Sequence, residues 1–186
     1  MLEISFNPFP VIETQRLTLR NFNKLDAETM LEMRSNVEMM KYICRPVLNT
    51  IEESEALIQR YENAINDNIG INWAVFLKSE NKIIGNVAFH KIDKENYRAE
   101  IGYYIHPNYW KKGFVTEAIE AIIKYGFEVY KFHSIEALID PRNEASKQVL
   151  NKFNFVEEGL VKENFYFEGE FLDTGIYSLL KSNYSL

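Results

Sequence analysis

The sequence contains a single cysteine, Cys44, so no disulfide can form within the chain. Such scarcity is typical of proteins in a reducing compartment. Cys44 lies in a Tyr-Ile-Cys-Arg-Pro segment that matches no protease signature, and we interpret it as a small apolar residue. The three histidines, His90, His106 and His133, are far apart and lack ligand spacing, so we expect no structural metal.

Long apolar runs are also missing. Charged residues interrupt every hydrophobic stretch before it reaches the length of a membrane span. The first ten residues lack the basic start and the apolar stretch of a secretory signal. We therefore expect no membrane association and a cytoplasmic location.

Positive charge is in deficit, because 27 acidic residues against 21 basic ones give a net charge of −6. This balance argues against a nucleic-acid binder, which needs a basic face. An anionic ligand would need a local basic site. The chain has no repeat and no linker-like stretch rich in proline, glycine or serine, so its 186 residues are expected to form one domain, 1–186.

Hydrophobic spacing predicts the order of strands and helices. Strands are predicted over 15–22, 72–78, 83–92, 97–105, 134–139, 155–166 and 171–180. Helices are predicted over 25–34, from Asn49-Thr50 to about 66, over 113–130 and over about 143–152. We expect an α/β (α+β) fold in which helices cover both faces of a mixed sheet.

The most informative stretch runs from Glu100 to Ala118 and passes from a strand through a short loop to a helix start. Lys111, Lys112 and Gly113 occupy that loop. A helix start offers free N–H groups and a positive dipole end, and a glycine lets the backbone approach a ligand closely. These features suit a diphosphate. Glycine-plus-lysine loops are common, however, and taken alone this one fits a solvated connection better.

The segment Trp110-Lys-Lys-Gly-Phe-Val-Thr-Glu-Ala118 resembles the acetyl-CoA pyrophosphate loop of the GNAT acetyltransferases, which reads Arg/Gln-x-x-Gly-x-Gly/Ala and continues with Thr/Ser-Glu-Ala. Tryptophan in the first place is typical of the branch that includes the ribosomal-protein N-terminal acetyltransferases. Three further segments are similar to that branch: Thr14–Arg20 to its first strand, Asn143–Phe155 to its Asn-x-x-Ser…Lys-x-Gly-Phe helix, and Tyr166–Asp173 to its last hairpin. The resemblance covers nearly the whole chain.

The resemblance implies a mostly antiparallel sheet of about seven strands, splayed at its centre, where the pantetheine of acetyl-CoA pairs with strand backbone. The residues that it implies for acetyl-CoA binding are Tyr104, Ile105, His106, Lys111, Lys112, Gly113, Phe114, Val115, Thr116 and Asn143. Three positions depart from the family pattern. Val115 replaces a glycine or alanine and would crowd the phosphates, Asn154 replaces the glycine of the Gly-Phe pair, and Leu150 stands where many other members carry a proton-donating tyrosine.

For catalysis, the resemblance implies direct transfer of the acetyl group in a ternary complex. We interpret Glu100 as the general base, acting through a water; the alternative is an outward-facing carboxylate paired with Arg98. Ser146, by analogy with the branch, protonates the CoA thiolate, or else only caps its helix locally. Asn143 binds the pantetheine amides, caps the helix, or does both. Glu117 is expected to make a structural contact.

The sequence therefore predicts an N-acetyltransferase that transfers an acetyl group from acetyl-CoA to a primary amine. A protein N-terminal α-amine is the easier acceptor, because its pKa is about 8 against about 10.4 for lysine. The alternatives are acetylation of a polyamine, antibiotic or metabolite amine, and a non-catalytic acetyl-CoA-binding module. Alternation places Tyr103 and Tyr104 on opposite faces of their strand, so one of them lines the acceptor pocket. Segment 24–70 carries no readable acceptor code, and both a monomer and a homodimer fit the sequence.

Overall fold

The computed structural model describes residues 1–184, which form one eight-stranded sheet and five α-helices besides short 3-10 turns. The strands are β1 (Ile12–Glu13), β2 (Leu17–Arg20), β3 (Ile71–Leu77), β4 (Lys82–Asp93), β5 (Arg98–Ile105), β6 (Ser134–Ile139), β7 (Val156–Phe167) and β8 (Glu170–Leu180). The helices are α1 (Ala27–Arg34), α2 (Val37–Met40), α3 (Ile51–Asn66), α4 (Phe114–Glu128) and α5 (Glu144–Lys152). None of these helices has the length and apolar character to cross a bilayer.

The sheet is mixed and mostly antiparallel, as predicted. Its strands lie in the order β1-β2-β3-β4-β5-β6-β8-β7, and every neighbouring pair is antiparallel except β5 and β6. The prediction of about seven strands misses β1, since a two-residue strand shows no alternation. The four-residue helix α2 is missed for the same reason, because it is too short for a helical pattern.

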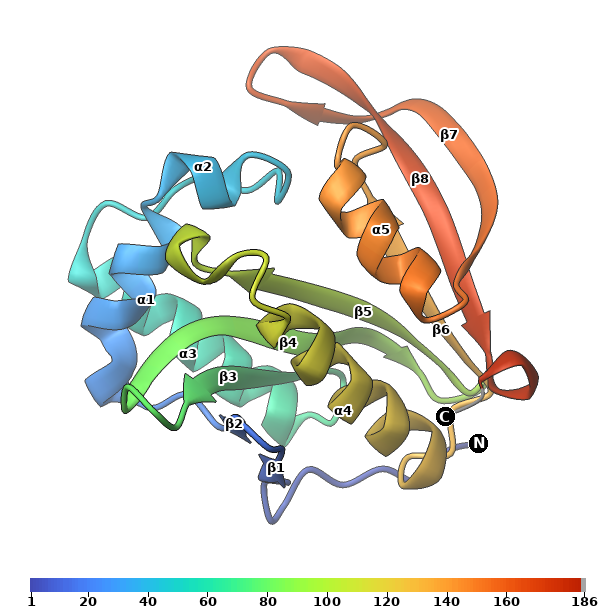
Figure 1. Ribbon diagram of the computed structural model, residues 1–186, viewed down its shortest axis with the longest axis horizontal. Helices are drawn as coiled ribbons and strands as arrows, with labels where there is room; N and C mark the ends of the chain where they lie inside the picture. The colour runs from blue at the N-terminus through green and yellow to red at the C-terminus, as the bar shows by residue number, and fades with distance from the viewer. Residues whose placement is uncertain (185–186) are drawn as a thin grey trace.

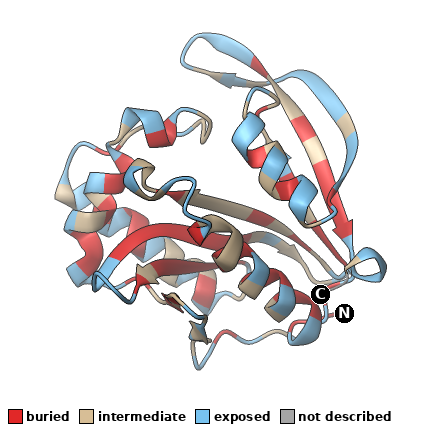
Figure 2. Cartoon of the chain, in the orientation of Figure 1, coloured by how far each residue is buried: buried red, intermediate tan, exposed pale blue. Residues whose placement is uncertain are grey.

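Helices cover both faces of the sheet, as predicted (Figure 1). The alternation of β3 shows how: Trp73 and Val75 belong to the core under α4, whereas Ala74 and Phe76 pack with the residues of α1 and α3. Helix α5 lies on the same side as α4, over β6 and β8. Buried residues run along the strands and the inward sides of the helices, while the outer part of the β7–β8 hairpin is mostly exposed (Figure 2).

The sheet is splayed between β5 and β6. These strands pair only from Arg98, opposite Ser134, to Glu100, opposite Glu136. Beyond that point β5 continues beside β4, and β6 continues beside β8. Figure 1 shows the two strands meeting near the chain termini and diverging from there. The predicted splay is confirmed, and it leaves one edge of β5 unpaired over residues 101–105.

The ends of two helices confirm how local sequence sets their bounds. Thr50 caps α3 by accepting a hydrogen bond from the Glu53 N–H, and the Glu53 carboxylate accepts one in return from the Thr50 N–H. After α5, Asn154 takes a left-handed conformation with φ of 61°. Asparagine tolerates this region better than most residues, which explains how it replaces the glycine of the family pattern.

Glu117 joins the start of α4 to the turn between β1 and β2. Its carboxylate accepts hydrogen bonds from the Thr14 hydroxyl (2.6 Å), the Arg16 N–H (2.8 Å) and Arg16 Nε (2.6 Å). Burial alone would raise the pKa of Glu117, but these hydrogen bonds and the charge of Arg16 hold it below its usual value. The expected structural contact of Glu117 is therefore confirmed.

Replacing this carboxylate should measurably destabilise the fold. We expect Glu117→Ala to lower the free energy of unfolding by about 1–3 kcal/mol, toward the lower figure because Arg16 is partly solvated. Urea denaturation measures the change. Glu120→Ala, at an exposed position of the same helix, is the control and should stay within about 0.5 kcal/mol of the native protein. Equal stabilities for the two variants would show that the contact contributes nothing.

Candidate active site

The start of α4 presents backbone N–H groups that no side chain caps. Gly113 precedes the helix with φ of 79°, and the first intrahelical bond runs from the Glu117 N–H to the Gly113 carbonyl (3.0 Å). The N–H groups of residues 114–116 come before that bond. Lys111 and Lys112 are exposed in the preceding loop, and Lys111 also takes a left-handed conformation. This end of α4 can therefore bind an anion such as a diphosphate.

Two of the side chains at this helix start turn inward. Phe114 is buried, and the Arg16 guanidinium lies 4.4 Å from the centre of its ring. The side chain of Val115 packs against the core under α4. Both residues thus offer only backbone to a ligand, and the branched side chain of Val115 is directed away from the site that it was expected to crowd.

The unpaired edge of β5 exposes backbone groups of alternate residues. The His106 N–H donates to the Ile84 carbonyl (2.8 Å), so the alternation turns the amides of His106 and Tyr104 toward β4. The amides of Tyr103 and Ile105 point the other way, into the splay. The amides of Tyr104 and His106 are therefore not available for the expected backbone contact. Ile105 stays a candidate for it, and Tyr103, which was not predicted, becomes one.

One hydrogen bond crosses the splay. The hydroxyls of Tyr103 and Ser146 lie 2.7 Å apart and join β5 to α5. Burial raises the pKa of Tyr103 to about 12, although the bond to Ser146 opposes this shift, so the phenol stays protonated at neutral pH. Asn143 caps α5 through its side-chain oxygen, which accepts from the Ser146 N–H (3.0 Å). The cap expected of Asn143 is confirmed, and the Ser146 hydroxyl is left for its partner on β5.

Glu100 lies where β5 and β6 part, on the face of the sheet that α1 and α3 cover. Its side chain is mostly buried, and Oε2 lies 2.9 Å from Nζ of the exposed Lys91, in an approach too oblique for a hydrogen bond. Arg98 does not pair with Glu100. It sits opposite Ser134, so the carboxylate of Glu136 is its diagonal neighbour and binds it at 2.5 Å. The interpretation of Glu100 as an outward-facing partner of Arg98 is wrong.

His90 stands directly opposite Glu100 in the β4–β5 hairpin, and the sequence analysis did not place it in the site. Its ring covers Gly102 so closely that a Cβ there would lie 2.7 Å from Nε2. Burial lowers the pKa of His90, and the negative charge of Glu100 opposes that shift only in part. The imidazole is therefore neutral at pH 7 and can accept a proton. Pairing the predicted strands 83–92 and 97–105 from their turn would instead set His90 opposite Ala99. The register shift between His90 and Asp93 brings His90 to Glu100, and the sequence carries no signal for that shift.

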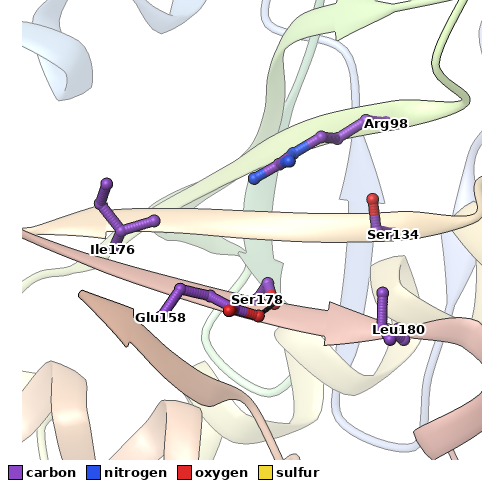
Figure 3. Close-up of a pocket in the computed structure, with 6 residues that line it drawn as sticks. All are labelled: Arg98, Ser134, Glu158, Ile176, Ser178 and Leu180. Atoms are coloured by element: carbon purple, nitrogen blue, oxygen red, sulfur yellow. Dashed lines mark hydrogen bonds between the residues drawn. The ribbon is translucent and has the colours of Figure 1, made fainter.

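A shallow pocket of about 310 Å³ opens on the same face of the sheet as Glu100. It is lined by Arg98, Ser134, Glu158, Ile176, Ser178 and Leu180 (Figure 3). The Ser178 hydroxyl donates to the Glu158 carboxylate at its floor. Its lining residues come from the start of β5 and from β6, β7 and β8, on the face opposite α5, and none of them belongs to the unpaired part of β5 or to the start of α4.

The comparison with known proteins identifies this arrangement. A family model described as "Acetyltransferase (GNAT) domain" matches residues 16–156. The chain belongs to the GNAT acetyltransferase family. It is 35% identical to "Uncharacterized N-acetyltransferase YoaA" of Bacillus subtilis (strain 168), over 93% of this chain and 98% of that protein. This GNAT protein is an acyl-CoA-dependent N-acetyltransferase, and the resemblance found in the sequence is confirmed.

Two solved structures share the fold, and their names give different substrates. The ribosomal-protein-S5-alanine acetyltransferase from Vibrio fischeri is 25% identical, with a TM-score of 0.82 over 95% of this chain and 100% of that one. The spermidine N-acetyltransferase from Vibrio cholerae, solved in complex with CoA and spermine, is 26% identical, with a TM-score of 0.81 over 92% and 99%. GNAT relatives of this chain therefore bind CoA.

The depressed pKa of His90 should make the fold sensitive to acid. Because the native pKa lies below the ordinary value of 6.5, the unfolded chain binds this proton more readily. His90 therefore lowers the free energy of unfolding as the pH falls from above 6.5 toward its native pKa. At higher pH it has no such effect, because the imidazole is neutral in both states. His90→Gln should lose less unfolding free energy than the native protein between about pH 7.5 and about pH 5. His133→Gln, at an exposed position, should match the native protein; equal losses in all three would contradict the assignment.

Proposed function

We propose that this GNAT enzyme acetylates the α-amino group of a protein or peptide N-terminus. Three observations support the proposal: the Trp110 branch motif, the uncapped start of α4 beside the open edge of β5, and the similarity to an S5-alanine acetyltransferase. The splay carries the argument, because it is the feature that lets an extended donor lie beside β5.

Acetyl-CoA supplies the acetyl thioester, and the residues present fit it. The free amides of residues 114–116, with Lys111 and Lys112, hold the diphosphate. The amides of Tyr103 and Ile105 pair with the pantetheine and hold the carbonyl oxygen at the edge of β5. Asn143 uses its oxygen as a helix cap, which leaves its side-chain N–H groups for the pantetheine.

Glu100 and His90 remove the proton from the acceptor amine. Glu100 is mostly buried, and its Oε2, although 2.9 Å from the Lys91 ammonium, forms no hydrogen bond, so it can accept one from a bound water or ammonium group. The neutral imidazole of His90 lies beside it and helps to orient that donor. An α-amine, with a pKa of about 8, demands only a modest base.

Ser146 and Tyr103 return a proton to the CoA sulfur. The Ser146 hydroxyl lies at the splay and can donate to the departing thiolate, while Tyr103, which stays protonated, donates to Ser146 in turn. Leu150 is fully buried in the core and takes no part.

Replacing Glu100 distinguishes an enzyme from a passive CoA-binding protein. We expect Glu100→Gln to lower kcat by about 10²–10⁴-fold, while the Kd for acetyl-CoA in calorimetry stays unchanged. The assay is thiol release with peptides that carry free α-amines. Glu95→Gln, in the exposed turn between β4 and β5, should retain full activity. Full activity of Glu100→Gln would show that Glu100 is not the general base. A native protein that does not bind CoA would overturn the proposed function.

The Tyr103–Ser146 pair predicts a coupled loss. Ser146→Ala and Tyr103→Phe should each lower kcat about tenfold, since a thiolate is a good leaving group and needs only modest help. The double variant should lose little more than either single one, because both changes break the same proton path. Gln148→Ala, exposed on the same helix, is the control. Multiplicative losses in the double variant would show that the two hydroxyls act independently.

A polyamine is the second candidate acceptor, because the chain is 26% identical to a spermidine N-acetyltransferase over most of its length. The same assay decides between them. Spermidine should give a kcat/KM well below that of the best peptide, and the reverse order would reassign the acceptor.

A further inference from the structure

Arg34, the last residue of α1, is a buried cation without a partner. Only 8% of its surface is exposed, and its guanidinium forms no hydrogen bond or ion pair with any side chain or carbonyl of residues 1–184. Its Nε is fully enclosed and unsatisfied. A guanidinium carries five N–H donors, and burying a charge without a partner costs several kcal/mol in proteins.

The side chains around Arg34 are donors too. Its guanidinium carbon lies 5.9 Å from the ring centre of Tyr104, whose hydroxyl contacts the weakly accepting sulfur of Met30 (3.7 Å) and is also hydrogen-bonded to the Tyr61 hydroxyl. Burial raises the pKa of Tyr61, and the positive charges of Arg34 and Arg60 oppose this shift. These guanidinium and phenol groups thus form a cluster inside an acidic protein. Within residues 1–184, no carboxylate belongs to that cluster.

Neither the aromatic contact nor the helix end offsets the free-energy cost of burying the Arg34 charge. A cation over a tyrosine ring contributes about 0.5–2 kcal/mol, and a cation at a helix C-terminus about 0.3–1 kcal/mol. Neither contact supplies an acceptor to the enclosed Nε, and no group of residues 1–184 accepts a hydrogen bond from the rest of the guanidinium. The cluster is complete only when an anion from outside the chain accepts those bonds, and a planar carboxylate matches the fork of the guanidinium.

We propose that Arg34, together with Tyr61 and Tyr104, binds a carboxylate of the acceptor molecule. Tyr104 and Glu100 lie four residues apart on the same face of β5, with Gly102 and the covering His90 between them. Four residues of a strand span about 13 Å. The acceptor is therefore an amine that carries a carboxylate on the same molecule, at a distance comparable to two or three residues of a peptide. This inference rests on the proposed acetyltransferase reaction.

The same cluster disfavours polyamines. A buried guanidinium repels a polycation that reaches along β5 from Glu100, and no acid within residues 1–184 lies close enough to pair with Arg34. A peptide with an acidic residue near its N-terminus can place its amine at Glu100 and its carboxylate at Arg34. An amino acid whose amine and carboxylate are separated by a long chain can do the same.

A series of ω-amino acids of increasing length, each compared with its primary amide, tests the carboxylate contact. The two members of a pair differ in one charge and share the amine. At one chain length the native enzyme should prefer the acid by about tenfold or more in kcat/KM. In Arg34→Gln this preference should vanish through KM, while the KM for acetyl-CoA stays unchanged. Lys41→Gln, which removes a surface charge nearby, should keep the preference.

The outcomes separate this inference from the proposed function. Equal rates for acids and amides at every length, or a preference that survives in Arg34→Gln, overturn the carboxylate site while leaving the acetyltransferase intact. The same pairs are titrated calorimetrically into the protein saturated with CoA, where no transfer can occur. Selective binding of the acids without any turnover would overturn the proposed reaction but support the carboxylate site at Arg34. Should Arg34→Gln fail to fold, Tyr104→Phe removes one donor and should reduce the preference, and an unchanged preference counts against the cluster.

Discussion

The parting of β5 from β6 beyond Glu100 and Glu136 is the constraint on which the rest of the structure depends. In a continuous sheet the amides of Tyr103 and Ile105 would bond to the neighbouring strand, and none would be left for a ligand. Helix α4 follows that open edge after the short connection of residues 106–113 and lacks a side-chain cap. Both sets of unpaired N–H groups therefore lie on one continuous stretch of backbone, residues 101–116, which suits a single extended ligand with a polar middle and an anionic end.

The alternation of β5 divides the chemistry between two faces of the sheet. Tyr103 points toward α5 and reaches Ser146, so the groups that can return a proton lie on one face. Glu100 and Tyr104 point toward α1 and α3, beside His90 on β4. In the proposed mechanism, proton removal and proton return therefore take place on opposite faces of β5, and the gap between β5 and β6 connects the two faces. A one-residue slip of β5 would exchange these roles, which is why its register with β4 matters for activity.

Most of the fold was predictable because its signals are local. The capping box at Thr50 and the αL position at Asn154 are set by residues within a few positions, and so were the strand alternations. What the sequence could not reveal depends on segments far apart in the chain. Arg98 pairs with Glu136 because β6 lies beside β5, and Ser146 meets Tyr103 because α5 packs across the splay. The resemblance pointed to residues 110–118 as the candidate CoA loop. The unusual environments of the other candidate residues come from burial by the packed helices, which the sequence does not show.

The overall negative charge of the protein does not prevent it from binding anions, because each candidate site acts at contact distance. At physiological salt, charges separated by more than about 8 Å in solvent are largely screened, so a net charge of −6 costs little at either place. The start of α4 uses backbone amides and exposed lysines, so its attraction is reduced further by salt. The side chain of Arg34 is largely buried, so dissolved ions screen its charge less than they screen an exposed one. Composition counts charges without regard to burial, so a negative total does not exclude anion sites formed by buried cations or by backbone N–H groups.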